Sequence, residues 1–230
     1  IFPVAVACTS LGVGVMVGIN SVVARALGEG DVTRAARCAN FGIVFACACG
    51  VMMGLALWLA IDPIFAAMNA PLHLMPLIRA YMTPYSMGFP LSLVIMGFNG
   101  VLRGQGEAKR TSTISIAYAA ANWVLNPVLI TGAFGFEGFG IAGSAYATAI
   151  GWGIGVLTAI ALLRGTSLPL NFGLLRHCRL IDPAMAIIKV GLPAAFSNAI
   201  NPLGLSILTA LVALEGEAAV AGFGAAGRLQ

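Results

Sequence analysis

The sequence of 230 residues has little charge: only 9% of its residues are Asp, Glu, Lys or Arg, while 60% are hydrophobic. Soluble domains carry about 25% charged residues, so this composition excludes an ordinary water-soluble fold and indicates a lipid environment. Aromatic residues are sparse too, at 8%, whereas glycine occurs 29 times. Helices packed through small side chains fit this balance, and a β-barrel with aromatic girdles does not. The composition predicts an all-α bundle of transmembrane helices.

Groups of residues that carry enzymatic chemistry are also missing. The cysteines lie in apolar stretches or in one basic loop, without the paired spacing of a zinc site or the framework of a disulfide-rich domain. The apolar stretches hold no constellation of His, Cys or carboxylate groups, which speaks against a membrane enzyme. We therefore expect that the protein is not an enzyme, and that it has no metal site and no cofactor beyond a coupling ion. The net charge of +4 is not massed on one face, so nucleic acid is not an expected partner.

Long charge-free runs are what the sequence does contain. A helix needs about 20 apolar residues to cross the hydrocarbon core of a bilayer. The runs that meet this length are residues 1–24, 39–61, 80–102, 111–136, 138–163 and 190–214. Another begins near Ala218 and reaches the last residue, and the first is apolar from its first residue. We expect six full spans, the start of a seventh, and a chain truncated at both ends.

Basic residues alternate between the loops that join these runs. The first, third and fifth loops each carry several Lys or Arg residues, whereas the second, fourth and sixth carry one or none. The positive-inside rule then predicts a multi-pass protein of the cell (inner) membrane with its odd-numbered loops in the cytoplasm. Glycine can end a helix in the left-handed region and Asp31 can cap the next helix. We interpret Gly28, Arg103, Gly104 and Gly106 as parts of cytoplasmic turn motifs.

The fifth loop is the longest and mixes apolar with basic residues. Its segment 168–189 has the composition of a helix that lies on the membrane surface. Asp182 and Pro183 would begin the second part of that helix, as N-cap and first helical residue. We predict a first lobe at 1–164, a cytoplasmic surface linker at 165–189 and the start of a second lobe at 190–230.

Polar side chains inside the spans are candidates for a transport path, because they are costly in a membrane unless they are paired. Asn122 and Asn126 are four residues apart and project from one helix face. Pro127 removes the backbone donor for the carbonyl of Trp123, which would bend the helix and expose carbonyls. A polar, bent helix of this kind can bind a cation or an organic amine. The alternative, which the spacing alone favours, is hydrogen bonding between helices without a ligand.

Five stretches, in this order and spacing, resemble those of the multidrug and toxic compound extrusion (MATE) family. They are 21–31, 102–109, 122–127, 140–148 and Gly191-Leu-Pro193. The resemblance implies twelve helices in two lobes of six, of which this chain holds helices two to seven and the start of helix eight.

The resemblance also implies a cation site. In archaeal and related members an Asn and an Asp on helix five and a Thr on helix six form it, and Asn122, Asn126 and Thr148 occupy the matching positions. Asn126 therefore replaces a titratable Asp. Asn201 likewise stands where members of another branch carry a Glu on helix seven. The coupling ion, Na⁺ or H⁺, is left open by these two uncharged residues.

We expect a secondary active exporter, in which two lobes alternate access and an ion gradient drives small, often cationic, organic compounds outward. Asn122, Asn126 and Thr148 are the expected contacts to cation or substrate, and Tyr85, Asn198 and Asn201 the expected cavity-lining residues. A lipid-linked oligosaccharide flippase of the same superfamily is the nearest alternative, although no span carries a Lys or Arg at mid-depth. A membrane-embedded enzyme is a more distant one.

Overall fold

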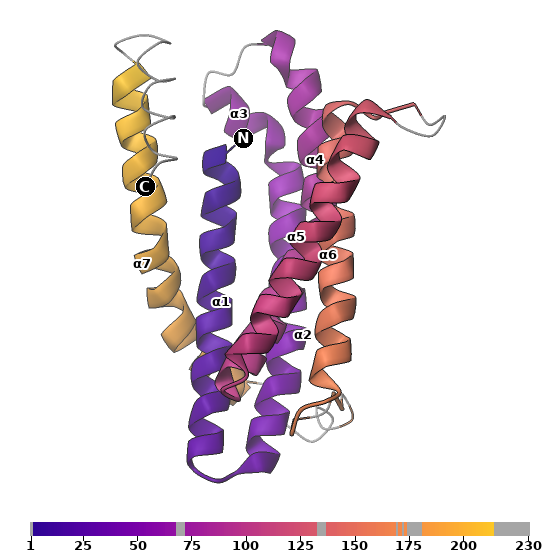
Figure 1. The fold of residues 1–230 in the computed structure, drawn as a ribbon. Coiled ribbons are helices and arrows are strands. Elements are labelled where there is room, and N and C mark those ends of the chain that lie inside the picture. The colour runs from indigo at the N-terminus through magenta and orange to yellow at the C-terminus, as the bar shows by residue number, and fades with distance from the viewer. Residues whose placement is uncertain are drawn as a thin grey trace.

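The computed structural model describes residues 2–67, 72–132, 137–168, 170, 171, 173 and 181–213, and in these residues the secondary structure is helical. Long helices run side by side along the molecule (Figure 1). Their bounds are α1 (Phe2–Gly28), α2 (Val32–Leu59), α3 (Ile61–Ala67), η1 (Leu72–Leu74), α4 (Met75–Gly104), α5 (Ala108–Thr131), α6 (Ile141–Leu163) and α7 (Ile181–Ala213).

Six helical segments are long and apolar enough to cross a membrane, among the residues that the structure describes. They belong to α1, α2, α4, α5, α6 and α7, so the six predicted spans and the all-α class are confirmed. The run that starts near Ala218 lies outside the described residues. Several helices extend beyond their apolar runs: α2, for example, begins at Val32 and includes Arg34 and Arg37 in its first turns.

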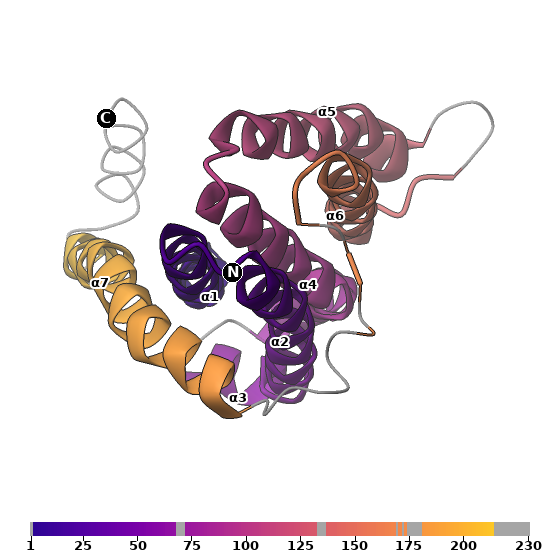
Figure 2. The same ribbon diagram turned by 90° about the horizontal axis from the view of Figure 1, so that it is seen from below.

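α4 forms the centre of the bundle. It packs against α1 and α2 on one side and against α6 on the other, and it contacts α5 more lightly (Figure 2). Its side chains Met82, Phe89 and Leu93 are fully buried. α5 instead rests mainly on α6, and α7 mainly on α1. α5 and α7 therefore lie at opposite edges of the described bundle (Figure 2).

Two turns of the same design join neighbouring helices at one end of the bundle. Gly30 and Gly106 have φ angles of +77° and +80°. The N–H of Glu107 donates to the carbonyl of Leu102, and the N–H of Gly106 to that of Arg103. The same pair of bonds closes the turn at Gly30. This is the Schellman pattern, which requires a left-handed residue and so favours glycine.

The structure distinguishes the predicted turn residues from one another. Gly28 is the last residue of α1, and Gly104 is the buried last residue of α4. A Cβ at Gly104 would lie 2.9 Å from the Cβ of Val23, so this glycine serves the close approach of α4 to α1. Only Gly106, of the predicted glycines, forms a left-handed turn, and Arg103 is exposed beside it.

The loops predicted to be cytoplasmic share one end of the molecule. The α1–α2 turn, the α4–α5 turn, the end of α6 and the start of α7 all lie at the lower end in Figure 1. We call this the basic end. At the other end, Arg79 donates two hydrogen bonds to the carboxylate of Asp62, at 2.8 and 2.9 Å. Among the residues that the structure describes, the segregation of basic residues that the sequence indicated therefore holds in three dimensions.

The segment after α6 is fastened to α2 by a buried amide. The Asn40 Oδ1 accepts a 2.9 Å hydrogen bond from the backbone N–H of Asn171. The Nδ2 of Asn40 donates to the carbonyl of Ala36 in its own helix at 2.8 Å, which orients the amide. Asn40 is 1% exposed. One buried side chain therefore fixes the path of the connection between α6 and α7.

Of the expected surface helix at 168–189, most of residues 169–180 lie outside the described residues, and residues 181–189 belong to a longer helix. Asp182 and Pro183 do stand at the start of a helix, but that helix is α7, which runs from Ile181 to Ala213 through Pro193 without a break. Residues 181–189 are therefore its first turns, because nothing at Lys189 or Val190 stops a helix that has begun. The division of the chain into two lobes stays a prediction.

Candidate functional site

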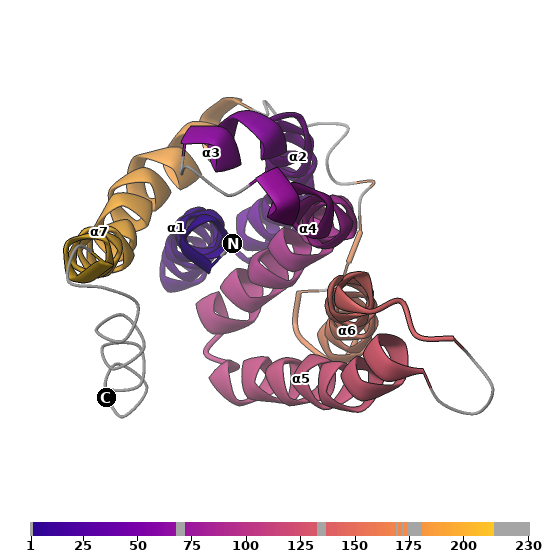
Figure 3. The same ribbon diagram turned by 90° about the horizontal axis from the view of Figure 1, so that it is seen from above.

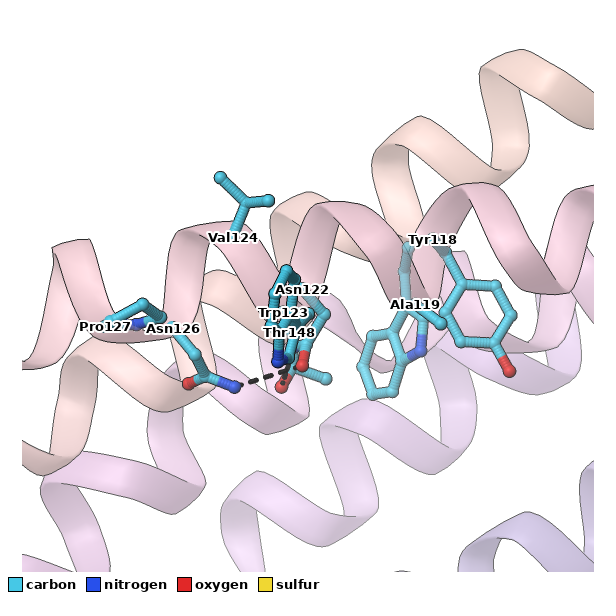
Figure 4. A pocket seen from close by; sticks show the side chains of 9 residues that line it. Tyr118, Ala119, Asn122, Trp123, Val124, Asn126, Pro127 and Thr148 are labelled. Carbon is cyan, nitrogen blue, oxygen red and sulfur yellow. Dashed lines mark hydrogen bonds between the residues drawn. The ribbon is translucent and has the colours of Figure 1, made fainter.

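A chain of hydrogen bonds joins α5 to α6. The Nδ2 of Asn126 donates to the Oδ1 of Asn122 at 3.0 Å, and the Nδ2 of Asn122 donates to the Oγ1 of Thr148 at 3.1 Å. The Thr148 hydroxyl in turn donates to the carbonyl of Ser144 at 2.9 Å. In Figure 4 the two asparagine side chains point to one side of α5 and Val124 points to the other. The structure thus brings together the three residues predicted to contact a cation or substrate.

The chain of bonds has a direction, and it begins at an unused acceptor. The Thr148 proton is committed to Ser144, and each amide donates toward the next member. The Oδ1 of Asn126 is shielded from solvent and has no hydrogen-bond partner. An unpaired buried carbonyl costs about 1–3 kcal/mol. The site therefore favours a ligand that brings a hydrogen-bond donor or a positive charge to this oxygen.

A pocket of about 830 Å³ lies against these residues. Its polar lining is Asn122, Asn126 and Thr148, and its apolar lining includes Tyr118, Trp123, Pro127 and Trp152. α5 continues through Pro127 to Thr131, so the proline lies on the wall of the pocket and does not end the helix. This volume is within the usual range of small-molecule sites, which are mostly apolar with a few placed polar groups.

Trp152, which the sequence analysis did not select, forms an aromatic wall of the pocket. Its ring makes edge contacts with Tyr85 and with Phe89, at centroid distances of 5.4 and 6.3 Å. Tyr85 also stacks on Tyr81, with centroids 5.8 Å apart. Aromatic contacts of this kind hold a ring in one orientation. The indole is thus positioned one turn of α6 beyond Thr148, on the same face.

Tyr85 and Asn198 do not line the pocket. Tyr85 is 6% exposed and stands behind Trp152. Asn198 is exposed on α7 and donates to the carbonyl of Ala194 in its own helix. Asn201 belongs to α7, but its side chain lies outside the part that the structure describes.

The chemistry of the site is that of neutral oxygen and nitrogen groups. The described residues contain no group of three or more His, Cys, Asp or Glu side chains that could hold a metal. A cation at the pocket would meet amide and hydroxyl oxygens, which are the ligand types that hard cations prefer. No carboxylate among the lining residues would change its protonation during binding.

Comparisons with known proteins agree with this architecture. The family model MatE matches residues 2–128. The chain is 30% identical over its full length to a "FAD transporter" of Shewanella oneidensis, of which it covers 51%, and 26% identical over 97% of its length to the "Probable multidrug resistance protein YoeA" of Bacillus subtilis, of which it covers 49%.

A solved structure, described as the inward-facing conformation of a multidrug resistance MATE family transporter of the MOP superfamily, matches with a TM-score of 0.85 and 28% identity. The match covers 99% of this chain and 51% of that one. The chain thus spans about half the length of the curated relatives and of the solved transporter that it matches.

Proposed function

The chain belongs to the MatE family, and we therefore propose that it forms part of a secondary active multidrug exporter. In this function, an inward gradient of Na⁺ or H⁺ drives small organic compounds, often cationic, out of the cell. Two lobes open a central cavity to each side of the membrane in turn. Residues 1–164 contribute to the first lobe, and residues 190–230 begin the second. The basic end faces the cytoplasm of the inner membrane, in accordance with the positive-inside rule.

The observation that supports this function best is the polar chain on the wall of the pocket. Asn122, Asn126 and Thr148 lie together within helices that are otherwise apolar, and polar groups at membrane depth mark substrate and ion pathways. The unpaired Oδ1 of Asn126 gives an ammonium group or a cation a place to bind. Trp152 and Tyr118 add aromatic faces, on which organic cations and flat rings are held.

The absence of a carboxylate from the pocket lining shapes the coupling step. Since the three polar residues are neutral, an ion and a cationic substrate would compete for the same oxygens and not for the same charge. Competition of this kind gives antiport when the protein changes its access only with one of the two ligands bound. Either Na⁺ or H⁺ coupling is compatible with it when further groups outside these residues take part.

Transport into inverted membrane vesicles tests the proposal. The protein is produced in a strain without its own exporters, and the uptake of a fluorescent cation such as ethidium is followed after a Na⁺ or a pH gradient is imposed. Uptake that depends on one of these gradients supports the exporter. Vesicles that accumulate neither cationic nor neutral dyes above the level of empty vesicles would contradict it.

A flavin is the second candidate substrate. The relative from Shewanella oneidensis that matches the whole chain is named a FAD transporter, and the aromatic wall at Trp152 suits a flat ring system. The discriminating measurement is the amount of flavin in the medium of cells that produce the protein. A rise in extracellular flavin that disappears when Trp152 is replaced, in cells whose protein does not export ethidium, favours the flavin.

A further inference from the structure

α7 is attached to the rest of the described molecule by a narrow stripe. Its buried residues, where side chains are described, are Ile187, Gly191 and Ala195, spaced four apart. This stripe lies against Gly14 and Gly18 of α1, which are also four apart. The described part of α7 contacts α1 and, lightly, α2, and no other helix. The attachment therefore consists of small residues, at which the backbones meet, together with the buried side chain of Ile187.

The two helices meet at their backbones. A Cβ built on Gly14 would lie 2.5 Å from the carbonyl oxygen of Gly191, and one built on Gly18 would lie 2.5 Å from the carbonyl oxygen of Ile187. A Cβ on Gly191 would lie 2.7 Å from the carbonyl oxygen of Gly14. Real Cβ atoms do not approach so closely, so none of these glycines can be replaced without moving a helix. Backbones in membranes come together in this way through pairs of small residues four apart.

Such a contact resists the separation of α7 from α1 more strongly than it resists a change in the angle between the two helices. Glycine and alanine surfaces have little relief and oppose a change of angle less than a full set of interdigitating side chains would. Among the described side chains of α7, Ile187 is the one large buried residue at the crossing, where it packs against Gly18. On the side toward α2, a groove of about 180 Å³ bordered by Phe45, Met52 and Leu192 separates the helices. Away from the crossing, α7 and α1 part toward the end opposite the basic end (Figures 1 and 3).

We propose that the crossing of Gly14 and Gly18 with Gly191 is a pivot, on which α7 tilts relative to α1 while its contact point stays in place. The tilt opens or closes the groove between α7 and α2 and moves the far part of α7 most. This inference rests on the proposed function, since it assigns the contact about which the second lobe begins to move against the first. Nothing in it depends on which substrate or ion is carried.

Spin-label distances test the pivot in the intact protein, in a background without native cysteines. One label is attached to α2 at Val44. The second label is attached to α7, either at Ile188, beside the crossing, or at Ile200, beyond it. The side chains of Val44, Ile188 and Ile200 are 42%, 41% and 66% exposed. We expect a narrow distribution for Val44 with Ile188, and a broad or two-peaked one for Val44 with Ile200. The second distance should shift with pH or Na⁺ and the first should not.

Two outcomes overturn the proposal: equal narrow widths for both pairs, which mean a rigid contact, or equal shifts of both pairs, which mean that α7 slides as a whole. Both spin-label distances are measured without a transport assay. A failed transport assay therefore argues against the proposed function and not against the pivot. Conversely, transport with two invariant distances removes the pivot and leaves the exporter.

A matched pair of substitutions adds an independent check. A Cβ on Gly12 would meet only the flexible side chains of Leu93 and Met96, at 3.5 Å. We expect Gly18→Ala to lengthen the distance between Val44 and Ile188 and to reduce transport, and Gly12→Ala to change neither. The pivot is wrong when Gly18→Ala folds and leaves both distances as they were. Should Gly18→Ala not fold, the label distances in the unsubstituted protein still decide.

Discussion

The side-chain amide of Asn122 donates a 3.1 Å hydrogen bond to the hydroxyl of Thr148, across the contact between α5 and α6. The two residues are 26 positions apart in the chain and come from antiparallel neighbours. This bond turns a pair of asparagines on one helix into a polar site between two helices. The Thr148 hydroxyl in turn donates to the backbone carbonyl of Ser144, which extends the chain of hydrogen bonds to the backbone of α6.

The first prediction concerns this bond. Thr148→Ala removes the acceptor for Asn122 and should lower the rate of substrate transport about tenfold, since an unpaired buried group costs about 1–3 kcal/mol and about 1.4 kcal/mol corresponds to a factor of ten. Thr158→Ala is the control on the same helix, because that hydroxyl bonds only to the carbonyl of Ile154. Thr148→Ser keeps the oxygen and should retain transport. Equal rates for both alanine variants, at equal membrane levels, would remove Thr148 from the site.

A second prediction follows from the neutral character of Asn126. Asn126→Asp places a carboxyl where the unpaired Oδ1 lies. The ionised form of a carboxyl attracts cations. Binding of an organic cation should therefore strengthen as the pH rises and the introduced carboxyl loses its proton, whereas the unsubstituted protein should show a flatter profile. Titration of ethidium binding at several pH values measures this.

The matched control for that experiment is Asn198→Asp, because Asn198 is exposed on α7 and bonds only within its own helix. It adds the same charge to the protein at a distance from the pocket. An identical pH profile for the two aspartate variants would mean that net charge, and not the pocket, produced the effect.

The third prediction concerns Trp152. Trp152→Leu should weaken the transport of flat aromatic substrates by about tenfold, because stacking and cation–π contacts contribute about 0.5–2 kcal/mol in addition to apolar burial. Aliphatic ammonium compounds should be affected less. Trp58→Leu, on the outer side of α2 and away from this pocket, is the control. Relative transport of ethidium and a tetraalkylammonium ion gives the comparison, and a uniform loss for both would contradict a stacking role.

A fourth prediction separates the loop glycines. Gly106→Ala forces an L side chain into a left-handed conformation and should destabilise the protein by about 1–2 kcal/mol. Gly28→Ala lies at the end of α1 with no atom within 4 Å of the new Cβ, so it should be neutral or slightly stabilising. Thermal unfolding in detergent measures both. The assignment of the turn is wrong if Gly28→Ala lowers the midpoint more than Gly106→Ala does.

The helices could be predicted from the sequence because the length of an apolar run and the thickness of a bilayer are both fixed quantities. The pairing of Asn122 with Asn126 could be predicted as well, since a spacing of four defines one helix face. Their meeting with Thr148 could not be derived in that way. It depends on which faces of α5 and α6 pack together, and only the resemblance to known transporters pointed to it.

Polarity alone does not show which aromatic residue reaches the pocket. Tyr85 carries a hydroxyl but lies buried behind Trp152, which lines the pocket. Gly151, next to Trp152, and Gly155, three residues after it, indicate a close helix contact in the sequence. The left-handed turns depend on Gly30 and Gly106, and no composition rule tells Gly30 from Gly28 two residues earlier.

The amide of Asn40 limits how far the start of α7 can move away from α2. It holds the chain at Asn171, and α7 begins ten residues later, at Ile181. Ten residues of extended chain reach at most about 35 Å. The start of α7 therefore stays within about this distance of Asn40 as long as the hydrogen bond to Asn171 holds. Deleting residues from this connection would restrict how far the start of α7 can move from α2 without changing Asn122, Asn126 or Thr148.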